Sequence, residues 1–142
     1  MKKMLLLIAM IPLLIGCGKN TSQSESSKEY ETTMTLFIDE QQMNITWEDN
    51  SSTQALDELG ELTIEMHRYG GFEQVGSIGH TLPSDDKEIT TSYGDVVLYS
   101  SNQLVIFYGS NTWAYTKLGH INMSQSELTS LLDKENVTVL IK

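Results

Sequence analysis

The sequence predicts a mainly β domain, folded as a small closed barrel with two short flanking helices. Three features point to this fold: short segments in which apolar and polar residues alternate, two stretches that begin with helix-capping residues, and turn residues between the segments. Many short strands with few helices favour a closed barrel, because closure leaves no unpaired strand edge. We expect one such domain, over residues 34–142.

The N-terminal part of this domain reads as two strands and a helix. Residues 34–38 and 43–47 alternate apolar with polar side chains on either side of a polar DEQQ stretch, which predicts a β-hairpin. Ser51 is followed three residues later by Gln54, which resembles a capping box, and Gly60 is a typical residue for a helix C-terminus. We therefore expect a short helix between Ser51 and Gly60.

The middle of the domain predicts one strand, an irregular segment and a second hairpin. Alternation resumes at residues 62–67 and is broken by Gly70 and Gly71, after which a loop carries the Leu82-Pro83 pair. Residues 96–99 and 104–108 are rich in β-branched and aromatic side chains, and a short polar stretch separates them. This pattern is typical of a hairpin.

The C-terminal part predicts a strand, a helix and a final strand. Trp113 and Tyr115 suggest the first strand, which Leu118 would extend. Ser124 and Glu127 have the spacing of a capping box and precede a leucine-rich helix. The alternating residues 137–141 then predict a last strand that returns to the sheet.

Residues 1–16 have the layout of a lipoprotein signal peptide. Two lysines precede the apolar run 4–15, which is shorter than the about 20 residues that a bilayer-spanning helix needs. Residues 14–17 read Leu-Ile-Gly-Cys, and they resemble the lipobox of bacterial lipoproteins. Cys17 is the only cysteine in the sequence, so the chain has no intramolecular disulfide.

The lipobox resemblance implies cleavage before Cys17, a diacylglycerol thioether on its sulfur and a further acyl chain, such as palmitate, on the new N-terminus. Several acyl chains would anchor the protein firmly to a cell membrane, on its extracytoplasmic face. The alternative is a cleaved, untethered secreted protein. Residues 17–33 are polar and rich in Ser, Thr, Glu and Lys, so we expect a flexible tether there.

Composition and motifs exclude several kinds of partner. The chain carries a formal net charge of −10, which makes nucleic acid an unfavourable partner because binding relies on Lys and Arg. The three histidines at 67, 80 and 120 are dispersed, so no metal site is expected. Phosphate-binding glycine motifs and the GxSxG elbow are absent from the sequence, so we predict no cofactor and no hydrolase activity.

Two longer stretches carry a family resemblance. Residues 69–79 read YGGFEQVGSIG, and residues 94–121 read GDVVLYSSNQLVIFYGSNTWAYTKLGHI. Together with the Leu82-Pro83 pair, they resemble the bacterial cyclophilin-like domain family. The resemblance covers residues 34–142 and implies a compact β-barrel similar to that of the cyclophilin peptidyl-prolyl isomerases, without implying a known activity.

Comparison with the isomerases assigns candidate site residues. Arg68 would polarise the proline amide as the catalytic residue, by electrostatic stabilisation. The ligand-binding residues would be Phe72, Gln74, Gln103 and Trp113. The pattern departs from the isomerases in two ways, since the spacings from Arg68 to Phe72 and from Phe72 to Gln74 are each one residue shorter.

A further departure lies on the predicted pocket floor, where Val105 replaces a phenylalanine of the isomerases. Arg68 also has a structural interpretation, as an ion pair with Glu73 or a solvated strand end. The aromatic residues 107, 108, 113 and 115 either line a ligand groove or pack in the core.

The leading hypothesis is a membrane-anchored lipoprotein whose barrel binds a peptide, a protein or a small ligand without catalysis. The first alternative is a peptidyl-prolyl isomerase acting on exported proteins. The second is an interaction scaffold without a pocket.

Overall fold

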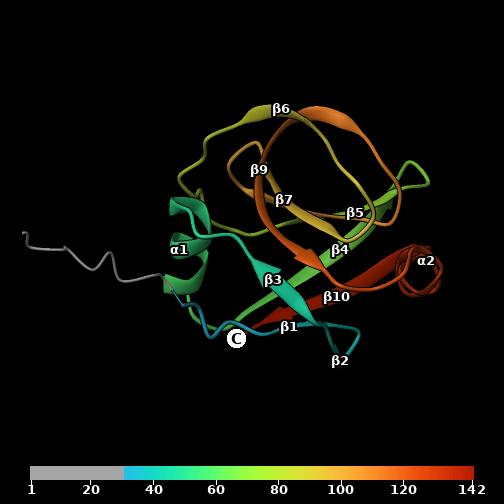
Figure 1. Cartoon of the computed structure of the whole chain (residues 1–142). Coiled ribbons are helices and arrows are strands. Elements are labelled where there is room, and N and C mark those ends of the chain that lie inside the picture. The colour runs from blue at the N-terminus through green and yellow to red at the C-terminus, as the bar shows by residue number, and fades with distance from the viewer. Residues whose placement is uncertain (1–30) are drawn as a thin grey trace, which may run out of the picture.

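The computed structural model describes residues 31–142 (Figure 1). Cys17, with the predicted signal peptide and most of the predicted tether, lies outside these residues. The elements in chain order are β1 (Leu36–Ile38), β2 (Gln41–Gln42), β3 (Ile45–Trp47), α1 (Ser51–Glu58), β4 (Leu62–Tyr69), β5 (Glu73–Ser77), β6 (Lys87–Thr90), β7 (Asp95–Tyr99), β8 (Gln103–Phe107), β9 (Thr112–Ile121), α2 (Gln125–Leu132) and β10 (Asn136–Ile141).

The strands form a curled antiparallel sheet in the order β2-β1-β10-β4-β5-β8-β7-β9-β3, and β6 pairs with β9 beside this path (Figure 1). The mainly β class with two short helices is confirmed. The sheet is open, however, so the predicted closed barrel is not confirmed. Its two ends are β2 and β3, which are neighbours in sequence but form no ladder with each other within residues 31–142.

The N-terminal hairpin forms, but with a shorter second strand than expected. β1 pairs with β2 across a tight turn in which Asp39 and Glu40 have φ values of 45° and 68°. β3 pairs with β9 instead, where Ile45 lies opposite Ile121. The prediction that residues 43–47 complete the hairpin was therefore wrong, because alternation specifies a strand but not the distant strand with which it pairs.

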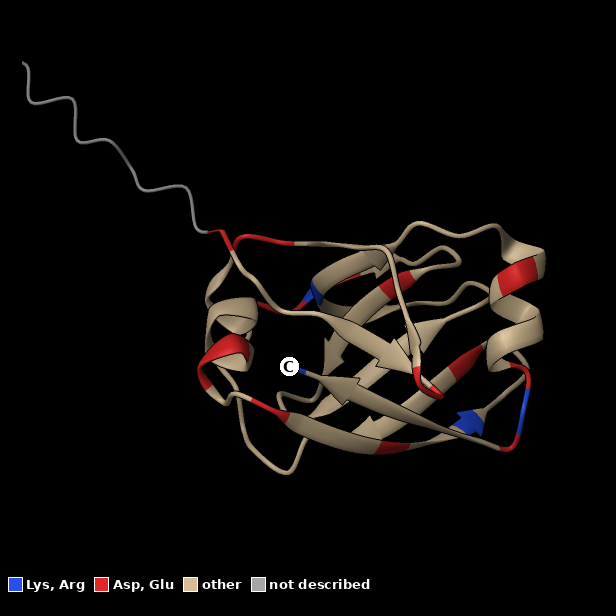
Figure 2. Cartoon of the chain, turned by 90° about the horizontal axis from the view of Figure 1, so that it is seen from below, with Lys and Arg blue, Asp and Glu red and all other residues tan. Residues whose placement is uncertain are grey.

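Both predicted helices are present and lie at opposite ends of the domain (Figures 1 and 2). The N-cap of α1 is Asn50, whose side chain accepts from the Thr53 backbone N–H at 2.9 Å, so the predicted cap at Ser51 is wrong by one residue. Gly60, with φ of +73°, follows the end of α1 as predicted. The capping box between Ser124 and Glu127 at the start of α2 is confirmed.

The strands predicted at 62–67, 113–118 and 137–141 are confirmed as β4, β9 and β10, and the second hairpin as β7 and β8. The segment after Gly71 is more regular than expected, because it contains β5 and β6. β5 has little side-chain alternation and includes Gly76, where an added Cβ would lie 2.7 Å from the carbonyl oxygen of Glu65 on β4. A side chain there would collide with β4, so this strand cannot show the usual apolar pattern.

The sheet buries side chains on both faces. The larger core takes residues from strands along the whole sheet and from both helices, including Leu56 of α1 and Leu128 of α2. The smaller core lies on the other face of β5, β7 and β8, and consists of Val75, Val97, Val105, Phe107 and Tyr115. Because β7 and β8 contribute alternate residues to both cores, they are apolar throughout rather than alternating.

Acidic residues are spread over the strands, loops and both helices, whereas basic residues are few (Figure 2). Among residues 31–142 no helix is long and apolar enough to cross a membrane.

Candidate functional site

A pocket of about 450 Å³ opens beside the smaller core, on the face of the sheet opposite the helix-covered core. Its floor contains Val75 of β5 and Val105 of β8, which are paired across the two strands. The lining residues are His67, Tyr69, Glu73, Val75, Tyr99, Gln103, Val105, Asn111, Trp113 and Tyr115. This volume suits a small molecule or a few side chains of a peptide.

Aromatic side chains form much of the pocket wall. The ring of Tyr115 meets Tyr99 edge to face at 6.0 Å between centroids, and it meets Phe107 at 5.6 Å. The amide Nδ2 of Asn111 donates to the Tyr115 hydroxyl at 3.0 Å, which holds this ring in place. Trp113 stands at the rim with 58% of its surface exposed. The wall is therefore partly fixed by packing and partly open to a ligand.

Glu73 supplies the carboxyl group of the pocket. It is the first residue of β5 and is only 6% exposed, between Tyr69 of β4 and Phe107 of β8. Its Oε2 atom is buried and has no hydrogen-bond partner among residues 31–142. Burial raises the pKa of Glu73 from 4.5 to about 7, because desolvation disfavours the charged form.

Burial also raises the pKa of Tyr115, and the nearby Glu73 carboxylate raises it further. Neither Lys nor Arg is present in the pocket lining among the described residues. Within residues 31–142, the pocket therefore offers Glu73 no Lys or Arg to stabilise its charged form.

Comparison with protein families shows the family to which this domain belongs. The sequence profile described as the cyclophilin-like family matches residues 36–142, which is more than half of the chain. The chain belongs to the cyclophilin-like family. The family resemblance expected from the YGGFE and GDVVLY stretches is thereby confirmed. A search of curated proteins gave no match.

In this cyclophilin-like domain the candidate residues Arg68 and Gln74 lie on the face of the sheet opposite the pocket. They pair across β4 and β5, between residues that line the pocket. Arg68 binds Asp133, just after α2, with 3.0 Å between Nη1 and Oδ1, rather than the Glu73 partner considered from sequence. Gln74 is fully buried, and its Nε2 donates to the carbonyl oxygens of Leu132 and Lys134 at 2.8 and 2.7 Å.

The other three candidates lie nearer the pocket. Gln103 and Trp113 line it, whereas Phe72 packs against the smaller core and is absent from the lining. The structure therefore brings two of the five candidates together, and it separates them from Arg68 and Gln74. Of the aromatic residues weighed for a groove, Phe107 and Tyr108 are buried, while Trp113 and Tyr115 contribute to the wall.

Several pocket residues were not identified from the sequence. Glu73 was considered only as an ion-pair partner, because β5 was not predicted and its facing side was unknown. His67, Tyr69 and Tyr99 stand on the pocket side of recognised strands or at their ends. Side chains alternate between the two faces of β4, so His67 and Tyr69 lie on the face opposite to that of Ile64 and Met66. This alternation could have identified His67 and Tyr69 from the sequence.

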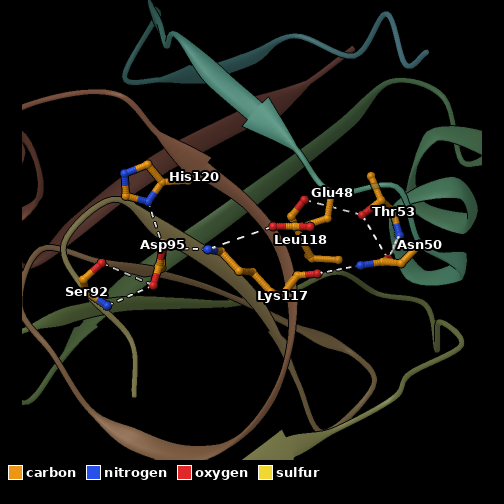
Figure 3. Close-up of polar contacts among 8 residues, drawn as sticks. All are labelled: Glu48, Asn50, Thr53, Ser92, Asp95, Lys117, Leu118 and His120. Carbon is orange, nitrogen blue, oxygen red and sulfur yellow. Dashed lines mark hydrogen bonds and ion pairs between the residues drawn. The ribbon is translucent and has the colours of Figure 1, made fainter. Parts of the chain in front are cut away.

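A second polar cluster surrounds Asp95, at the start of β7 (Figure 3). Asp95 is 6% exposed, and its Oδ2 accepts from the Ser92 backbone N–H at 2.9 Å. Its Oδ1 lies 2.8 Å from His120 Nδ1 and 3.5 Å from Lys117 Nζ. A nucleophilic triad requires the serine hydroxyl to contact the imidazole, but Ser92 contacts Asp95 instead. The cluster thus joins β7 to β9 and gives no sign of catalysis.

Within residues 31–142 no group of three or more His, Cys, Asp or Glu side chains is placed to hold a metal ion. The pocket with Glu73 is therefore the best candidate site in the described part of the chain.

Proposed function

We propose that the protein is a membrane-anchored lipoprotein whose cyclophilin-like domain binds a small ligand or a short peptide segment in the Glu73 pocket. The observation that carries the binding proposal is the combination in one pocket of aromatic walls with a buried carboxyl oxygen that lacks a partner. Ligand sites commonly combine an apolar lining with a few polar groups that fix orientation. The scaffold alternative predicts no such pocket.

Binding can be mapped by NMR on the full chain in detergent micelles, with a library of small molecules and short peptides. We expect ligands to shift the indole N–H resonance of Trp113 and the methyl resonances of Val105. Trp113→Ala should weaken binding by about tenfold or more, because a large aromatic contact is lost. Tyr93→Ala is the matched control, since Tyr93 is also an exposed aromatic residue but does not line the pocket. Ligands that shift only resonances elsewhere, or that bind the Trp113 variant normally, would contradict the proposal.

The anchor is proposed from the Leu-Ile-Gly-Cys motif at residues 14–17. The Cys17→Ser variant should lack the lipid mass and should leave the membrane fraction or stay unprocessed, because the acceptor sulfur is gone. Intact-mass spectrometry of the wild type and the variant checks this expectation. Identical masses, apart from the sulfur-to-oxygen change, would contradict lipid attachment at this residue.

The isomerase alternative requires Arg68 to act on a proline held near Trp113. Arg68 instead faces α2, where it binds Asp133, and Trp113 stands at the pocket on the other face of the sheet. No contact among the described residues favours this alternative over ligand binding, so we propose a non-catalytic function.

A further inference from the structure

Two acidic side chains are buried in the described domain, and they differ in one respect. The carboxylate of Asp95 contacts Ser92, His120 and Lys117 (Figure 3). Glu73 is buried to the same extent, yet its Oε2 has no partner within residues 31–142. Unpartnered buried polar atoms are costly and uncommon in folded proteins. Glu73 itself lines an open pocket, so a ligand held there lies beside a carboxyl group that has an unpartnered oxygen.

We propose that the pocket recognises a protonated primary amine attached to an aromatic or apolar group, with the amine N–H donating to the carboxylate of Glu73. This inference rests on the proposed function, because it names the ligand class of the same site. The apolar part of the ligand lies against Val105 and the rings of Tyr99, Tyr115 and Trp113.

Three features favour a cation over a neutral or anionic ligand. An ammonium group supplies both the missing hydrogen bond and the opposite charge that Glu73 lacks. Aromatic rings, which form the wall around it, attract cations through the negative faces of their π systems. The chain is acidic, with 19 Asp and Glu against 9 Lys and Arg, so its field attracts cations and repels anions.

The titratable groups around Glu73 come from several strands. His67 and Tyr69 of β4, Tyr99 of β7 and Tyr115 of β9 share the pocket lining with it. The charge of Glu73 also contributes to raising the pKa of Tyr108, which follows β8. Arg68 is adjacent in sequence to His67 but is paired with Asp133 on the other face. Because the imidazole of His67 lines the same pocket, the experiment includes a variant that removes it.

The test is isothermal titration of the full chain in detergent micelles at pH 8 with four matched probes. These are 2-phenylethylamine, its N,N,N-trimethyl derivative, 2-phenylethanol and 3-phenylpropionate. We expect the primary amine to bind most tightly, the trimethyl cation less tightly because it has no N–H donor, and the alcohol and the anion at least tenfold more weakly than the amine. N-acetyl-lysine methylamide serves as a fifth probe, which shows whether the amine can come from a peptide side chain.

Three variants test whether the Glu73 carboxylate is the group that recognises the amine. Glu73→Gln should weaken binding of 2-phenylethylamine by about 10- to 100-fold, as expected for loss of a charge-assisted hydrogen bond. Glu58→Gln removes the same charge from the exposed surface of α1 and should leave affinity unchanged. In His67→Gln, affinity should still rise between pH 6 and pH 8, because Glu73 still ionises there.

The outcomes separate this inference from the proposed function. If 2-phenylethanol binds as tightly as the amine, or Glu73→Gln binds the amine normally, amine recognition is overturned while ligand binding in the pocket stands. If none of the five probes binds, amine recognition is overturned, and the library mapping still decides whether the pocket binds another class of ligand. If library ligands also fail to reach the pocket, the proposed function fails with it.

Discussion

Replacing Glu73 by Gln should stabilise the protein at neutral and alkaline pH while changing little at acid pH. Burial raises the pKa of Glu73 from 4.5 to about 7, so the folded state binds this proton more tightly than the unfolded state does. The contribution of Glu73 to folding stability is therefore lost as pH rises from 4.5 through 7. Raising the pKa from 4.5 to about 7 corresponds to at most about 3.5 kcal/mol.

Urea denaturation of both proteins at pH values from 4 to 8.5 measures the effect. The free energy of unfolding of the variant, minus that of the wild type, should grow between pH 4.5 and pH 7 and level off above it. Glu58→Gln is the control, because Glu58 is exposed and its removal should give a difference that stays flat with pH. A flat difference for Glu73→Gln as well would show that its carboxyl group is solvated in the folded protein.

Gly94→Ala should destabilise the domain by about 3 kcal/mol or more. Gly94 has φ of +90°, and a Cβ there would lie 2.5 Å from the carbonyl oxygen of Ile121. Its own N–H donates to Phe107 at 2.8 Å, and its carbonyl accepts from Ile121 at 2.7 Å, so the backbone cannot move away without losing these bonds. The added Cβ would also lie 3.0 Å from Cε1 of His120, which belongs to the Asp95 cluster (Figure 3).

Thermal and urea denaturation give the size of this effect. Gly71→Ala is the control, because nothing lies within 4 Å of the added Cβ and its φ is not in the left-handed region. That change should be neutral or stabilise by about 0.5 kcal/mol, through a less flexible unfolded chain. If the two alanine variants were equally stable, the turn before β7 would have space for a Cβ at residue 94, and the prediction would be contradicted.

Local signals predicted the elements that depend on neighbouring residues. The α2 capping box uses Ser124 and Glu127, both within one turn of the helix, so the sequence pattern was sufficient. At α1 two suitable caps stand side by side, Asn50 and Ser51, and only the folded contacts select Asn50. The pairing of β3 with β9 joins residues far apart in sequence, and no local pattern encodes it.

The same distinction explains what was predicted of the candidate site. Gln103 and Trp113 were predicted from the family resemblance, and both line the pocket. Glu73 was not predicted as a pocket residue, because β5 was not predicted and most glutamates are exposed. Its burial depends on how β5 lies between β4 and β8.

Titration of the Glu73 carboxyl carbon by NMR, with and without 2-phenylethylamine, tests most directly the claim that the pocket is a binding site built around this group. We expect a pKa of about 7 in the free protein and a lower pKa with the amine bound, because a nearby cation stabilises the carboxylate. A pKa near 4.5 that the amine leaves unchanged would contradict both the burial of Glu73 and its role in recognition.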